Sequence, residues 1–114
     1  MRSTQSTLAV DVQPDGATVH VRLEGELDMT SSPLLQAVVD QTLAARRVPR
    51  CHRLVVDMSG VSFADASGIS PLLLARARLA RRGGRVELRH CRRAVLRLIR
   101  LLDLADMLEL EGVG

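Results

Sequence analysis

Apolar and polar residues alternate over residues 8–12 of this chain and again over residues 17–23. A period of two is typical of strands that bury one face and expose the other. Pro14-Asp15-Gly16 lies between the two runs and is a strong turn signal. The first quarter of the chain therefore predicts an antiparallel hairpin.

The next segment carries the signals of a helix. Ser32 followed by Pro33 indicates its start, with Ser32 as the N-cap and Pro33 in the first helical position. Val48-Pro49 ends it near Arg46 or Arg47, because a residue before proline avoids the helical conformation. The apolar face is expected to contain Leu34, Leu35, Val38, Val39, Thr42 and Leu43.

The middle of the chain predicts a buried strand and a second helix. Residues 54–58, Leu-Val-Val-Asp-Met, form the apolar run expected of a central parallel strand. A loop from Ser59 to Ala66 follows, and Gly83-Gly84 ends the helix after it. The inner face of this helix is expected to contain Ile69, Leu72, Leu73, Ala77 and Ala80.

Residues 85–89 alternate again and predict a short strand. A third helix is expected from about Arg93 to Leu102, with arginines along one side and apolar residues along the other. Residues 107–110 predict a final edge strand. The 114 residues are expected to form a single domain, 1–114, with its core between about residues 8 and 110.

The predicted order is β-β-α-β-α-β-α-β, an α/β fold whose mixed sheet has a parallel centre and helices packed on one face. Right-handed crossovers make the second, third and fourth strands parallel. Their carboxyl ends then share one edge, where partners and ligands bind such sheets. The loops at residues 26–32, 59–67 and 90–93 are expected to meet there.

Composition excludes several classes of function. All 16 basic residues are arginines, spread over most of the chain, and the only aromatic residue is Phe63. Without aromatic residues to stack on bases, direct binding of nucleic acid is not expected. The polar residues 1–7 are followed by no signal-like apolar stretch, and the run at 72–75 is too short to cross a membrane. We expect a cytoplasmic protein that does not contact membranes.

The pairs Cys51-His52 and His90-Cys91 raise the question of a metal site or a disulfide. The predicted topology puts them at opposite ends of neighbouring parallel strands, roughly 15 Å or more apart. Zinc ligands lie within about 2.3 Å of the metal, and bridged cysteines have Cα atoms within about 7 Å. Free thiols, no metal and no cofactor are therefore expected.

Three segments, taken together, resemble a known family. Gly25-Glu26-Leu27-Asp28 comes first, residues 54–69 include Phe-x-Asp-x-Ser-Gly at 63–68, and Gly83-Gly84-Arg85-Val86 comes last. In this order and at these spacings they resemble the STAS domain. More narrowly, the chain from about Leu8 to Leu110 is similar to the bacterial anti-sigma factor antagonists.

The resemblance implies a partner switch. In that family the unphosphorylated antagonist binds an anti-sigma factor, so that a sigma factor is released for transcription. In the best-known branch the anti-sigma factor is itself a serine kinase. Phosphorylation of the serine before the glycine, Ser67 in this chain, separates the complex, and a phosphatase resets it. Asp28, Asp65, Ala66, Ser67 and Gly68 are the implied partner-binding residues. The family often has serine in place of Ala66, and Ser-Pro in place of Arg92-Arg93.

The residues themselves leave alternatives open. Ser67 is expected at or near the N-cap of the second helix, as a phosphorylation site or as a plain cap. Asp28 either orients a partner loop or ends a strand. Asp65 either holds the Ser67 loop or approaches a metal ion bound by the kinase, or it simply closes an Asx-type turn. Asp57 is expected to satisfy backbone donors of the loop.

Two other classes of function are alternatives to a partner switch. A serine hydrolase is not expected, because Asp65 and Ile69 replace the glycines of a Gly-x-Ser-x-Gly elbow and only His90 falls at the right edge. We therefore expect no enzymatic activity. A scaffold or accessory STAS module of a stress-signalling complex or a transporter is the alternative function.

Overall fold

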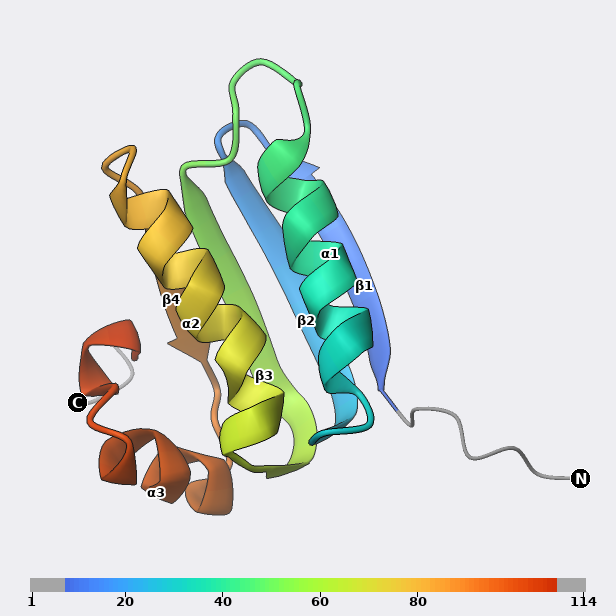
Figure 1. Ribbon diagram of the computed structural model, residues 1–114, viewed down its shortest axis with the longest axis vertical. Coiled ribbons are helices and arrows are strands. Elements are labelled where there is room, and N and C mark those ends of the chain that lie inside the picture. Colours follow the sequence, from blue (N-terminus) through green and yellow to red (C-terminus); the bar gives the residue numbers. More distant parts are fainter. Residues whose placement is uncertain (1–7, 109–114) are drawn as a thin grey trace, which may run out of the picture.

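The computed structural model describes residues 8–108 (Figure 1). The elements are β1 (Ala9–Asp15), β2 (Thr18–Leu27), α1 (Ser32–Ala44), β3 (Arg53–Ala64), α2 (Ala66–Ala80), β4 (Arg85–Arg89), α3 (Arg93–Leu101) and the short 3-10 helix η1 (Ala105–Met107).

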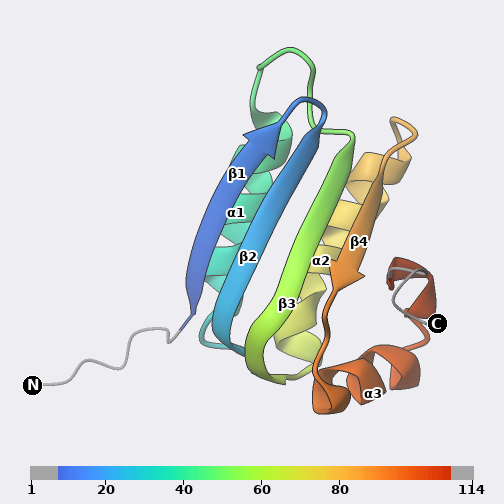
Figure 2. The same cartoon turned by 180° about the vertical axis from the view of Figure 1, so that it is seen from behind.

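The sheet has the order β1-β2-β3-β4 (Figure 2). β1 and β2 are antiparallel, with Asp15 opposite Thr18, and Gly16 takes the turn with a φ of +63° that favours glycine. β2, β3 and β4 run parallel. The predicted fold class, a mixed sheet with a parallel centre, is confirmed.

α1 and α2 cover one face of the sheet, and within the described residues 8–108 no helix lies on the opposite face (Figures 1 and 2). α3 lies beyond the carboxyl ends of β3 and β4. The buried residues of α1 are Leu35, Val39 and Leu43, all within the predicted face, whereas Leu34, also predicted there, is exposed. In α2 the prediction was wrong at Ala77 and Ala80, which are exposed, because the buried stripe runs through Ala75 and Leu79.

β3 is longer than predicted, and most of the expected loop from Ser59 to Ala66 is strand. Glu26 is opposite Phe63 and Leu27 is opposite Ala64, with register shifts earlier along the pair. A Cβ at Gly60 would lie 2.7 Å from the carbonyl oxygen of Leu23, so the irregular stretch needs glycine. The extension depends on pairing with β2, which local sequence patterns do not reveal.

The ends of the helices also differ from the prediction. Ser31 precedes the first helical residue of α1, which is Ser32, so Pro33 takes the second position. α1 ends at Ala44, before Arg46. The predicted edge strand at 107–110 is wrong at Met107, which ends η1. Leu108 makes a single parallel bridge to Leu88, and residues 109–110 lie outside the described residues.

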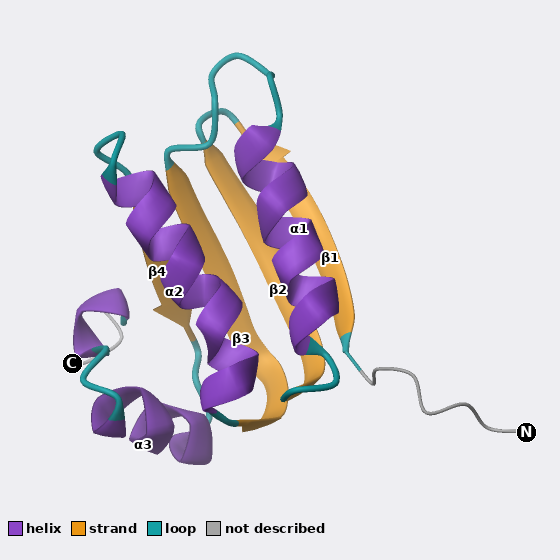
Figure 3. Ribbon diagram, in the orientation of Figure 1, coloured by secondary structure: helices purple, strands orange, loops and turns teal. Residues whose placement is uncertain are grey.

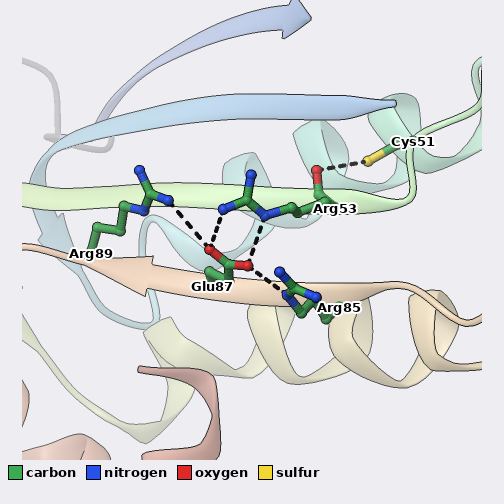
Figure 4. Close-up of polar contacts among 5 residues, drawn as sticks. All are labelled: Cys51, Arg53, Arg85, Glu87 and Arg89. Atoms are coloured by element: carbon green, nitrogen blue, oxygen red, sulfur yellow. Dashed lines mark hydrogen bonds and ion pairs between the residues drawn. The ribbon is translucent and has the colours of Figure 1, made fainter. Parts of the chain in front are cut away.

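The helix-free face of the sheet carries a cluster of charged residues around Glu87 (Figure 4). Arg53 donates to the two carboxylate oxygens at 2.7 and 2.8 Å, and Arg85 donates at 2.5 Å. Arg89 is 3.5 Å away. The hydrogen bond from Arg53, together with Arg85 and against the effect of burial, lowers the pKa of Glu87 to about 2.

Acid is expected to destabilise the protein through Glu87. Its pKa is depressed in the folded state, so its contribution is present above the ordinary value of 4.5 and is lost as pH falls toward 2. Solvent screening of the exposed arginines reduces the loss to about 1–2 kcal/mol. Urea denaturation over this pH range checks it: Glu87→Gln should flatten the decline, whereas Glu24→Gln should not. An equal decline in Glu87→Gln would contradict the prediction.

Candidate functional site

A single residue, Asp65, connects β3 to α2. It is the N-cap of the helix, and its Oδ1 accepts a hydrogen bond from the N–H of Gly68 at 2.9 Å. Its carbonyl accepts from Ile69 at 3.1 Å. Ser67, predicted at or near the N-cap, lies two residues after it, because β3 continues through Ala64 and the helix begins at Ala66. Asp caps a helix as well as Ser does.

Ser67 is the second residue of α2 and is exposed, as is Ala66 before it. Side chains in a helix tilt toward its N-terminus, so the Ser67 hydroxyl is presented at the free end of the helix. The structure therefore places Ser67 where another protein can reach it, although it is not the cap.

Pro71 lies in the second turn of α2 and is buried. The N–H of this position would have donated to the carbonyl of Ser67, four residues earlier, and proline has none. The carbonyl of Ser67 therefore lacks this one hydrogen bond of the regular helix.

Gly68 is where α2 touches the end of β2. A Cβ at this position would lie 2.0 Å from the carbonyl carbon of Leu27 and 2.5 Å from the backbone nitrogen of Asp28. The N–H of Asp65 donates to the Leu27 carbonyl at 3.0 Å. Glycine is therefore needed for the start of α2 to lie directly on the backbone that leaves β2.

The loop between β2 and α1 is held by reciprocal hydrogen bonds. Oδ1 of Asp28 accepts from the N–H groups of Thr30 and Ser31, each at 3.0 Å. The N–H of Asp28 donates to Ser31 Oγ at 3.0 Å, and that hydroxyl donates to the Glu26 carbonyl at 2.7 Å. Ser31 is only 1% exposed. Asp28 thus shapes the loop beside Gly68.

Sequence reasoning missed Ser31. The available signal was the Asp-x-x-Ser spacing of 28–31, which resembles a capping box with its residues exchanged. Its buried hydroxyl fixes the path of the loop, which carries Met29, a side chain that is 76% exposed.

The third segment at this end of the sheet leads into α3. Nε of Arg92 donates to the Ser59 carbonyl at 2.9 Å and so ties the start of α3 to β3. Figure 3 shows the three connections, β2–α1, β3–α2 and β4–α3, at the same end of the molecule, as the topology predicted. We call the surface formed by Asp28, Met29, Phe63, Ala66 and Ser67 the Ser67 edge.

Two titratable groups at this end of the sheet, Asp57 and Cys91, have pKa values displaced from their ordinary ranges. Burial would raise the pKa of Asp57, but the N–H of Ser59, at 2.9 Å from Oδ1, and the charges of His90 and Arg22 lower it overall. Asp57 therefore accepts from a backbone donor, as predicted. Burial raises the pKa of the Cys91 thiol to about 11, so this thiol stays protonated at neutral pH.

The two Cys–His pairs lie at opposite ends of the parallel strands, Cys51 before β3 and Cys91 after β4. Both cysteines are free. Among residues 8–108 there is no group of three or more His, Cys, Asp or Glu side chains that could hold a metal ion. In the same part of the chain, each helix is too short or too polar to span a bilayer.

Comparison with known proteins gives a family. The sequence pattern described as "Mlab, STAS domain" matches residues 10–109. The Anti-sigma F factor antagonist of Paenibacillus polymyxa is 24% identical over 106 residues, covering 93% of this chain and 86% of that protein. The chain therefore belongs to the STAS domain family.

Solved structures agree with this fold. The anti-sigma factor antagonist SpoIIAA in its unphosphorylated form matches with a TM-score of 0.76 at 21% identity, covering 89% of this chain and 86% of that one. An anti-sigma factor antagonist from Mycobacterium paratuberculosis matches with a TM-score of 0.73 at 25% identity, covering 90% and 83%.

Proposed function

We propose that this protein is an anti-sigma factor antagonist that binds an anti-sigma factor through the Ser67 edge and is released when Ser67 is phosphorylated. The observation that carries the proposal is the exposed Ser67 in the first turn of α2, on a helix that Gly68 fixes against the β2–α1 loop. Relatives named as anti-sigma factor antagonists support it.

A phosphate on Ser67 acts on docking more than on folding. It adds about −1.5 to −2 charges at neutral pH. The dipole of α2 favours an anion at this end. However, the carboxylate of Asp65 already accepts the hydrogen bond from the N–H of Gly68, and its negative charge repels the phosphate. The new charge therefore stays at the surface. A partner that covers it must strip its water, at a cost of several kcal/mol.

The partners in this proposal are an anti-sigma factor that is a serine kinase, and a cognate phosphatase. The protein acts by binding, in the cytoplasm, with no reaction of its own, and it controls transcription through the availability of a sigma factor. Sporulation and stress responses are the settings of such switches in the family. Because alanine stands at position 66, Ser67 has the only hydroxyl of the Phe-x-Asp-x-Ser-Gly motif that could accept the phosphate.

A scaffold or accessory module is the second candidate function. The matched family pattern carries the description Mlab rather than that of an antagonist, which favours it. Such a module would also bind through an exposed edge, but it would retrieve a different partner. The retrieved protein therefore separates the two functions.

The proposal is tested by titrating the protein with anti-sigma factors of the histidine-kinase-like class from the same genome. We expect saturable binding that displaces the bound sigma factor. Met29→Glu should weaken the affinity for the anti-sigma factor at least tenfold, because it puts a charge on the Ser67 edge. Leu74→Glu, on an exposed residue farther along α2, is the matched control and should not. Equal binding by both variants, or retrieval of a transporter ATPase instead, would contradict the proposal.

A further inference from the structure

β4 ends the sheet with an open edge. The N–H of Arg85 donates to the His52 carbonyl at 3.0 Å, toward β3. Backbone groups alternate in direction along a strand, so those of Val86 and Leu88 point away from β3. The outward backbone groups of Leu88 form the isolated parallel bridge to Leu108. Among residues 8–108, the strand order places no strand beside the first part of β4.

A groove of about 770 Å³ follows this edge and is lined from both sides of the sheet. On the helix side it meets Leu73, Ala77 and Ala80 of α2. On the helix-free side it meets Arg53, Arg85 and Arg89. A hollow that reaches both faces at a strand edge has the shape that one more strand would fill.

The two sides of the groove differ in chemistry. The helix side presents the apolar side chains of Leu73, Ala77 and Ala80, and its two charged residues, Arg76 and Asp106, form an ion pair with each other at 3.0 Å. The other side carries three guanidinium groups around the single carboxylate of Glu87 (Figure 4). Its net charge is positive, and the side chain of Arg85 is 68% exposed. Acidic groups are therefore favoured on this side and apolar groups on the other.

We propose that the β4 edge binds an extended segment of a partner protein in which acidic residues alternate with apolar ones. The segment adds as a fifth strand through the outward backbone groups of Val86. Alternate side chains of a strand face opposite sides, so its acidic residues meet Arg53, Arg85 and Arg89 while its apolar residues meet Leu73 and Ala77. No part of this site belongs to the Ser67 edge.

The direction of the chain points to a partner as the occupant. Leu108 is parallel to Leu88, so a strand continued from it would run past Arg89 and away from Arg85. The groove also meets the second half of α2, roughly 9–20 Å along the axis from Ser67. A partner segment can therefore occupy the β4 edge while another protein occupies the Ser67 edge.

The test uses the full chain, labelled with ¹⁵N, and a capped synthetic peptide in which Glu and Val alternate. We expect saturable amide shifts at Val86, Glu87 and Ala77, and slower hydrogen exchange at Val86 in the complex. Arg85→Glu and Ala77→Glu each should weaken binding at least tenfold. Arg97→Glu, the same charge change on the exposed side of α3, should leave it within twofold.

Three results would overturn the inference. Equal binding by a peptide with the same residues in two blocks would show simple charge attraction. Shifts at the Ser67 edge instead of the β4 edge would place the binding site elsewhere. Protection of the Val86 amide in the free protein would show that the chain covers its own edge.

Discussion

Gly68→Ala is expected to destabilise the protein by about 3 kcal/mol. The added Cβ would lie 2.0 Å from the carbonyl carbon and 2.1 Å from the carbonyl oxygen of Leu27. Both are backbone atoms at the buried end of β2, so no side chain rotation relieves the overlap. α2 or the β2–α1 loop must move, and with it the hydrogen bond from Asp65 to the Leu27 carbonyl.

Urea denaturation of the unsubstituted protein and of Gly68→Ala measures the difference in their free energies of unfolding. Gly16→Ala is the matched control: nothing lies within 4 Å of the added Cβ, and only the φ of +63° opposes it. That variant should lose about 1 kcal/mol. A loss below about 1 kcal/mol for Gly68→Ala would mean that the start of α2 is not held against Leu27.

Phosphorylation of Ser67 is expected to weaken binding to the anti-sigma factor at least 100-fold, about 2.7 kcal/mol. The phosphate is borne on an exposed residue at the centre of the proposed contact, where the partner would have to desolvate it. The stability of the unbound protein should change by no more than about 0.5 kcal/mol, because the helix dipole and the Asp65 carboxylate act in opposite directions.

Calorimetric titration of the phosphorylated and unphosphorylated proteins checks this prediction. After incubation with the kinase and ATP, Ser67→Ala should keep its full affinity, whereas Ser70→Ala should lose affinity as the original chain does. Ser70 lies one turn further into α2 and is half-buried. Unchanged affinity of a protein phosphorylated on Ser67 would rule out the switch while leaving the fold and the β4 edge untouched.

Ser67 and Gly68 thus have separate tasks although they are neighbours. Gly68 is buried against backbone, and a change there should act on stability. Ser67 faces outward, and a change there should act on binding. Measuring both properties for both positions distinguishes a damaged fold from a damaged interface.

The sequence by itself determined the architecture. Alternation around Pro14-Asp15-Gly16 predicts the hairpin, because a strand with one buried face has a period of two. The apolar run at 54–58 predicts the central strand. Right-handed crossovers then fix the parallel order and place Ser67 at the carboxyl ends of the strands. These signals are local or follow from chain handedness, so they need no knowledge of packing.

Only the tertiary structure decided where β3 ends, and with it the role of each residue in the Asp65–Gly68 motif. Residues 59–64 are strand because β2 lies beside them, so α2 starts at Ala66 and Asp65, not Ser67, caps it. The need for glycine at position 68 comes from the backbone of Leu27, about 40 residues earlier in the chain. Contacts between distant segments carry no local signal, which is why the sequence placed Ser67 at or near the cap but did not identify Asp65 as the cap itself.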